Sequence, residues 1–184
     1  MAHPLFARLD RQLELVRREL GNVSEADRRF RALRKLTAPA SKGGGLYHEW
    51  SHCASLADGV AAIYTGLESV LEAIGNEIDE YVPRGEGSHA ELLEGMAVAV
   101  RGVRPVVLSE ATRRLMHEAR KFRHVVRHKY ALELRRADVT KNLALARRLV
   151  PAFGRDYRRF GALMLDAGAA RQRTRKASRT RRRR

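Results

Sequence analysis

The length and composition of the chain suit one domain with extensions, because it has 184 residues, of which 44% are hydrophobic. Its 37 Lys and Arg outnumber its 21 Asp and Glu, and the net charge of +16 favours a polyanionic partner such as nucleic acid. The single cysteine excludes a disulfide-stapled secreted domain, and the lack of a long apolar run or a signal-peptide pattern predicts a cytoplasmic protein without a membrane partner.

The first part of the chain is expected to form two short helices and a linker. Apolar residues between Leu5 and Leu20 recur at steps of four and three, which marks one helix face. Gly21-Asn22 interrupts the pattern, and Ser24 with the acids just after it favours a new helix N-terminus, since a hydroxyl caps free amides. This second helix should end before Pro39. We therefore expect residues 1–45 to be an N-terminal helical segment and linker.

A long apolar helix is predicted next, over residues 46–81, because its buried stripe runs unbroken. The Pro- and Gly-rich stretch 83–87 should end it. Ser88 is then expected to cap a short helix that reaches about Val98, with Glu91 completing a capping box.

The remaining apolar pattern predicts two further helices, one from Ser109 toward Tyr130 and a last one with a kink or break at Pro151. No stretch shows sustained period-two alternation, so residues 46–170 should form an all-α bundle, and the fold about four to five helices. Residues 171–184 hold nine basic residues and no acid, and the rest of the chain still carries about +7. We expect this Arg-rich tail to be disordered, either merely solvated or a non-specific nucleic-acid arm.

A metal-binding pattern occurs at the start of the long helix, where residues 48–52 fit H-E-x-x-H. A catalytic zinc would need a third protein ligand, and Glu72 is the candidate by spacing. On one unbroken helix, however, Glu72 would lie on the order of 30 Å from His52. We therefore predict no metal and no cofactor, with these histidines partly exposed. A zinc hydrolase remains the alternative that metal analysis decides.

A second cluster of chemistry-bearing residues lies at 122–130, which holds five potentially cationic side chains and a phenol. Cleavage of RNA without a metal needs a base, an acid and fixed positive charge on the phosphate. A histidine titrates near neutrality and serves the proton transfers, whereas an arginine matches phosphate oxygens with its planar fork. The segment therefore has the chemistry of a ribonuclease site, although on composition alone a solvated basic helix face is the more common explanation of such a stretch.

The spacing of these residues resembles a known signature. Arg123-x4-His128-x-Tyr130 is similar to the R-x4-H-x-Y motif of HepT proteins, a case of the R-x4-6-H motif of the HEPN superfamily. In that superfamily a polar residue usually follows the arginine, and His124 agrees with this.

Three further elements resemble the same family in the same order. Residues 64–68 resemble its Y-x-G-[LIV]-E stretch, residues 85–96 its G-E-x-W-H-x-x-L-L-x-x-M element, and residues 104–109 also fit one HepT-like subgroup. Ser88 departs from the pattern, because the subgroup usually has Trp there. The resemblance covers about residues 55–165, and neither the first forty residues nor the tail contributes to it.

This resemblance implies a HEPN-type bundle that acts as a metal-independent ribonuclease toxin. Arg123 would stabilise the phosphate, His128 would transfer the proton, and His124 and Arg127 would bind or orient phosphate. In the family, a minimal nucleotidyltransferase antitoxin silences the toxin by adding AMP to the motif tyrosine, here Tyr130.

The helix geometry and the family agree on one further expectation. On a straight helix Arg123 and His128 point about 140° apart, so one copy of the motif does not complete a site. The family forms homodimers in which two motifs meet in one cleft. The alternative is a non-catalytic HEPN-fold protein that binds RNA or a partner.

Overall fold

The computed structural model describes residues 4–36, 44–128 and 134–181. The helices in these ranges are α1 (Pro4–Leu36), α2 (Gly44–Ile74), a π-helical turn η1 (Gly75–Asp79), α3 (Ser88–Met96), α4 (Glu110–His128) and α5 (Arg136–Arg181). The described ranges contain no strand, and only a single bridge joins Val100 to Arg104. The predicted all-α bundle is thus confirmed.

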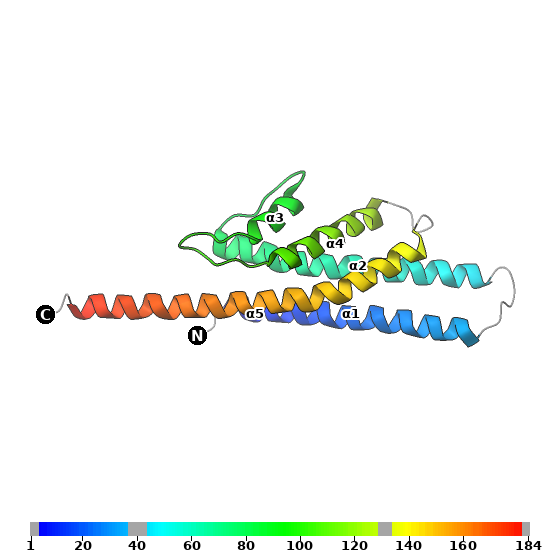
Figure 1. Cartoon of the computed structure of the whole chain (residues 1–184), viewed down its shortest axis with the longest axis horizontal. Coiled ribbons are helices and arrows are strands. Elements are labelled where there is room, and N and C mark those ends of the chain that lie inside the picture. Colours follow the sequence, from blue (N-terminus) through cyan, green and yellow to red (C-terminus); the bar gives the residue numbers. More distant parts are fainter. Residues whose placement is uncertain (1–3, 37–43, 129–133, 182–184) are drawn as a thin grey trace.

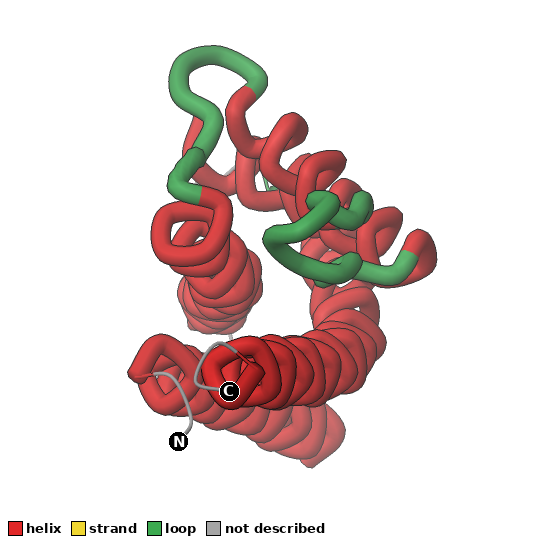
Figure 2. Tube along the Cα trace, turned by 90° about the vertical axis from the view of Figure 1, so that its left-hand side faces the viewer, coloured by secondary structure: helices red, strands yellow, loops and turns green. Residues whose placement is uncertain are grey.

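The helices form a bundle around α2, the most apolar of the long helices (Figure 1). Helices α1 and α5 lie side by side along its base, and α2 packs on both of them (Figures 1 and 2). Helix α4 closes the bundle against α2 and α5, and α3 rests on α2 and α4. A small second core surrounds the C-terminal half of α4, and its buried residues are Val23, Cys53, Leu56, Ala57, Val60, Phe122, Val139 and Leu143.

Helix α1 is continuous through Gly21, so the predicted break at Gly21-Asn22 was wrong. A glycine inside a helix costs only about 1 kcal/mol relative to alanine. Burial of the apolar side chains on both sides of it outweighs this cost, because Val16 and Val23 are 4% and 5% exposed. Ser24 does not cap a helix there; its hydroxyl accepts a hydrogen bond from Arg147 Nε at 3.2 Å.

Two glycines of α2 let α1 approach closely. A Cβ at Gly59 would lie 2.4 Å from Val23 Cγ2, and one at Gly66 would lie 2.5 Å from Val16 Cγ2. Both distances are far below van der Waals contact. Helix α1 is therefore part of the same packed core as α2 and α5, and Leu5 and Leu9 belong to it.

The start of α3 differs from the predicted capping box. Its N-cap is Gly87, with a φ of 83° and no side-chain cap, and Ser88 is already helical. Glu91 instead accepts a hydrogen bond from Tyr81 Oη at 3.1 Å. The left-handed backbone at Gly87 is readily adopted only by glycine, which explains why the helix begins one residue earlier than the serine pattern indicated.

The start of α4 agrees with the prediction. Ser109 Oγ accepts a hydrogen bond from the backbone N–H of Thr112 at 3.3 Å. The backbone and the hydroxyl of Ser109 both donate to Asp156 Oδ2 of α5, at 2.8 and 2.7 Å. Burial alone would raise the pKa of Asp156, but hydrogen bonds from Thr112 and Ser109 hold it below its usual value. This contact fixes the start of α4 on α5.

Helix α5 runs through Pro151 without a break and continues to Arg181. Figure 1 shows it bending in its yellow-to-orange half, in keeping with the kink that a proline favours. We expected residues 171–184 to be disordered, but residues 171–181 extend the helix, since Arg, Ala and Gln are good helix formers.

Candidate functional site

Arg123, the first residue of the predicted motif, points from α4 toward α2. Its side chain is 14% exposed. Arg123 Nε donates a hydrogen bond to Thr65 Oγ1 at 3.2 Å, and Nη2 lies 4.0 Å from Glu68 Oε2. The guanidinium carbon lies 5.8 Å from the ring centre of Tyr64. Three residues on one face of α2 thus hold the guanidinium in place while leaving part of it accessible.

Glu68 is the centre of this arrangement and is 3% exposed. Its Oε1 accepts a hydrogen bond from Tyr64 Oη at 2.5 Å and lies 2.8 Å from His89 Nδ1 of α3. Burial and the contact with Glu68 raise the pKa of Tyr64 well above its usual range, so the phenol stays protonated and donates. A single buried carboxylate therefore joins α2, α3 and α4 beside Arg123.

The Y-x-G-[LIV]-E stretch can now be explained residue by residue. Tyr64 and Glu68 form the buried polar pair, and Leu67 is fully buried in the core. Gly66 faces α1, where a Cβ would collide with Val16. The stretch thus contacts Arg123 on one side of α2 and α1 on the other.

A group of possible metal ligands adjoins the carboxylate. One ligand atom each from Glu68, Glu72 and His89 lies within 4.8 Å of the others. Burial raises the pKa of Glu72, and the negative charge of Glu68 raises it further. By residue type these side chains could hold a divalent cation. The guanidinium of Arg123 already supplies positive charge to Glu68, however, and it would repel a second cation at that carboxylate.

The other motif residues lie elsewhere on α4. His124, Arg127 and His128 are exposed, and the rings of His124 and His128 lie 4.3 Å apart between centroids, tilted by 43°. The structure therefore brings His124 and His128 together on a face that differs from that of Arg123. Tyr130 lies outside the described residues.

A basic strip extends from Arg123 along α4. Arg120 and Arg127 precede and follow Arg123 by three and four residues, so the three share one side of the helix. Arg120 is half-buried, and its Nε has no hydrogen-bond partner in the described part of the chain. The three guanidinium groups give this side of α4 a positive charge that suits an anionic ligand.

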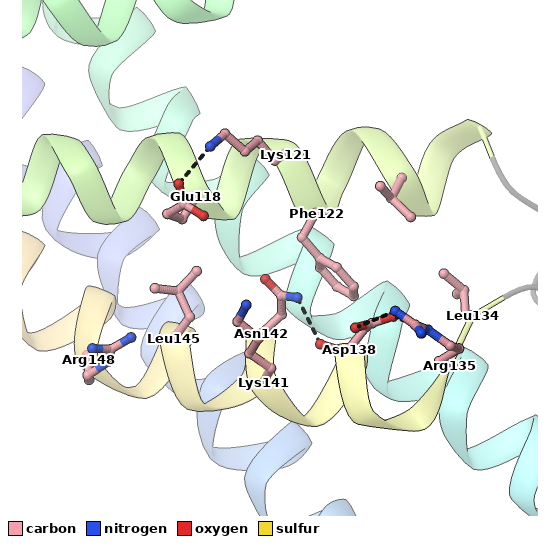
Figure 3. Close-up of a pocket in the computed structure, with 11 residues that line it drawn as sticks. Glu118, Lys121, Phe122, Leu134, Arg135, Asp138, Lys141, Asn142, Leu145 and Arg148 are labelled. Carbon is pink, nitrogen blue, oxygen red and sulfur yellow. Dashed lines mark hydrogen bonds and ion pairs between the residues drawn. The ribbon is translucent and has the colours of Figure 1, made fainter.

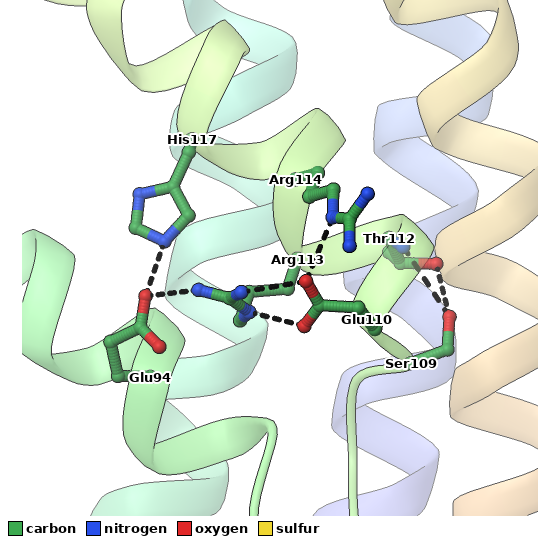
Figure 4. Close-up of polar contacts among 7 residues, drawn as sticks. All are labelled: Glu94, Ser109, Glu110, Thr112, Arg113, Arg114 and His117. Carbon is green, nitrogen blue, oxygen red and sulfur yellow. Dashed lines mark hydrogen bonds and ion pairs between the residues drawn. The ribbon is translucent and has the colours of Figure 1, made fainter.

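Polar contacts join α3, the helix that carries His89, to α4 (Figure 4). Glu94 of α3 lies 2.8 Å from His117 Nε2 and pairs with Arg113, both on α4. Arg113 also donates to Glu110 at 2.8 Å. Since α3 carries both His89 and Glu94, this ion-pair network helps to fix the position of the imidazole.

A hollow between α4 and α5 lies on another side of α4 (Figure 3). Its walls include Phe122 and the ion pairs Lys121–Glu118 and Arg135–Asp138, with N–O distances of 2.7 and 2.9 Å. None of the motif residues Arg123, His124, Arg127 and His128 lines it. We therefore place the candidate site at the α2–α3–α4 junction and not in this hollow.

The H-E-x-x-H pattern has a structural explanation. His52 stacks on Phe30 with ring centres 3.9 Å apart, and its Nε2 lies 3.9 Å from Asp27 Oδ1. Burial lowers the pKa of His52. Glu49 pairs with Arg34 at 3.0 Å. His52 is partly exposed, as predicted, and its contacts with Phe30 and Asp27 join α1 to α2.

The fold and the motif on α4 define the class of protein: an all-α bundle of the HEPN type. A family model described as HepT-like protein matches residues 55–164, which is more than half of the chain. The chain belongs to this family, as its motifs predicted. Comparisons with curated proteins and with solved structures found no match.

The matched range begins in α2 and ends in α5, so it contains Thr65, Glu68, His89 and Arg123. All of α1, the first part of α2 and the end of α5 lie outside it, and the division at residues 45 and 170 stays a prediction. Within the described residues, no helix combines the length and apolar character that a bilayer crossing requires.

Proposed function

We propose that the protein is a metal-independent endoribonuclease, the toxin of a HepT/nucleotidyltransferase-type toxin–antitoxin system in the cytoplasm. The observation that carries this proposal is the placement of Arg123. It is held by Thr65 and Glu68 yet remains partly accessible, in a strip with Arg120 and Arg127. Membership of the HepT-like family supports the same activity.

The proposed reaction is an internal phosphoryl transfer in RNA. The 2′-hydroxyl attacks the adjacent phosphorus, a bond from phosphorus to O2′ forms, and the bond to O5′ breaks. The products are a 2′,3′-cyclic phosphate and a 5′-hydroxyl, and no other reactant is needed. Arg123 stabilises the negative charge that develops on the phosphate oxygens, and His128 takes the proton of the 2′-hydroxyl.

The positions of the two motif residues support a homodimer as part of this proposal. Arg123 faces α2, whereas His128 is exposed beside His124. A second chain that presents its α4 to the first would place His128 of one copy opposite Arg123 of the other. In this cleft His124 and Arg127 would contact the flanking phosphates of RNA.

Control of the toxin is assigned to Tyr130. We propose that a minimal nucleotidyltransferase antitoxin adds AMP to this phenol, seven residues after Arg123 in the sequence. The added phosphodiester would pair with the cations of the motif and occupy the space that RNA needs.

Substitutions on α4 test the proposal. His128→Ala should lower the cleavage rate by ~10²–10⁴-fold and keep most RNA affinity, because proton transfer contributes that much. Arg123→Ala should lower both cleavage and affinity. Arg114→Ala is the control, since Arg114 is an exposed cation of α4 that pairs with Glu110. RNA binding without cleavage by the wild type would favour the non-catalytic alternative, and an unimpaired His128→Ala variant would remove the catalytic assignment.

A further inference from the structure

We propose that His89 is a second catalytic residue of this site and donates the proton to the leaving 5′-oxygen. This inference rests on the proposed function and completes its chemistry. Its basis is one shared carboxylate, because Glu68 lies 2.8 Å from His89 Nδ1 and 4.0 Å from Arg123 Nη2. Three helices thus bring an imidazole and the motif arginine to one buried anion.

The carboxylate fixes which ring nitrogen of His89 is available. Glu68 already accepts a hydrogen bond from the phenol of Tyr64, so it acts as an acceptor toward His89 as well. Nδ1 therefore donates to Glu68, and Nε2 is the atom that exchanges a proton with a ligand. The side chain of His89 is 42% exposed, whereas that of Glu68 is 3% exposed. The ring is therefore positioned by the buried carboxylate and is still partly accessible to a ligand, as proton transfer requires.

The reaction needs this second group because two protons move in it. One leaves the 2′-hydroxyl, and another must reach O5′ as its bond to phosphorus breaks. A single imidazole cannot serve both at once. With His128 as the base, protonated His89 gives its Nε2 proton to O5′, and solvent then returns the two imidazoles to their starting forms.

The test separates proton donation from a structural role through the leaving group of the substrate. His89→Asn keeps an N–H donor near the position of Nδ1 but has no counterpart of Nε2. Two substrates are compared, RNA and a uridine 3′-(4-nitrophenyl phosphate) ester. The nitrophenolate leaves as a stable anion and needs no proton, whereas the 5′-oxygen of RNA does.

We expect His89→Asn to slow RNA cleavage by ~10²–10⁴-fold and to change cleavage of the nitrophenyl ester by less than about tenfold. His128→Ala should slow both, since both need the base. The control His48→Gln changes an exposed histidine at the start of α2, away from Glu68 and Arg123, and should leave both rates near the wild-type values.

The remaining outcomes of these rate measurements would each contradict one part of the proposal. Equal losses on both substrates would make His89 a structural residue, and no loss on RNA would remove it from the reaction. Wild-type cleavage that EDTA abolishes would assign Glu68, Glu72 and His89 to a metal ion instead. A wild type that cleaves neither substrate would overturn the proposed function, and this inference with it.

Discussion

Gly66→Ala tests the close packing of α1 against α2, the helix whose side chains contact Arg123. The new Cβ would lie 2.5 Å from Val16 Cγ2, so one of the two must move by roughly 1 Å to reach ordinary contact. Overpacking of this kind costs ~1–3 kcal/mol. Replacing a helical glycine with alanine returns ~1 kcal/mol of helix propensity. The net result should be a loss of up to about 2 kcal/mol in the free energy of unfolding.

A matched control isolates the steric part of this change. Gly21 is also inside a helix, but a Cβ there would meet nothing within 4 Å. Gly21→Ala should therefore gain the propensity alone, and the two variants should differ by ~1–3 kcal/mol. Urea unfolding followed by circular dichroism measures both. The background Val16→Ala should relieve the strain and make Gly66→Ala neutral or stabilising.

The reasoning would be refuted by a Gly66→Ala protein as stable as Gly21→Ala. It would also be refuted if Val16→Ala failed to reduce the difference, because the collision assigned to Val16 would then not exist.

Three further predictions concern the site and its surroundings. Tyr64→Phe removes the hydroxyl that donates to buried Glu68 and should lower the free energy of unfolding by ~1.5–3 kcal/mol in urea unfolding; an unchanged midpoint would contradict the buried pair. Deletion of residues 171–184 should leave the fold intact and reduce the slope of log K against log salt for single-stranded RNA by ~0.7 per lost phosphate contact, whereas an unchanged slope would exclude a nucleic-acid arm. Tyr130→Phe should keep RNA cleavage and escape silencing by a co-expressed nucleotidyltransferase, and mass spectrometry of the wild type should find AMP on the Tyr130 peptide; silencing that survives the substitution would exclude this switch.

Hydrophobic periodicity was sufficient to predict most of the fold. The stripes of α2, α4 and α5 are regular because each of these helices buries one face, and Ser109 indicated the start of α4 through a local cap. The predicted helix break at Gly21 and the predicted N-cap at Ser88 were wrong because the conformational preference of one residue competes with the packing and backbone around it. The packing of α1 on α2 outweighs the low helix propensity of Gly21, and the left-handed backbone at Gly87 makes that glycine the N-cap in place of Ser88.

The candidate site was predicted only in part. Arg123 was found from its spacing to His128, but its partners come from other helices, 58 residues away in the case of Thr65. Glu68 and His89 lie in two of the stretches that resemble the family, residues 64–68 and 85–96. The sequence around each of them does not indicate that they are in contact. Their contact depends on how α3 packs on α2 and α4, which a single sequence does not reveal.

The ends of the RNA fragments that the purified wild-type protein produces in EDTA test the central claim most directly. We predict cleavage that leaves 2′,3′-cyclic phosphate and 5′-hydroxyl ends and that falls sharply in Arg123→Ala. No cleavage, fragments with 3′-hydroxyl and 5′-phosphate ends, or an activity that EDTA abolishes and zinc restores would contradict the account.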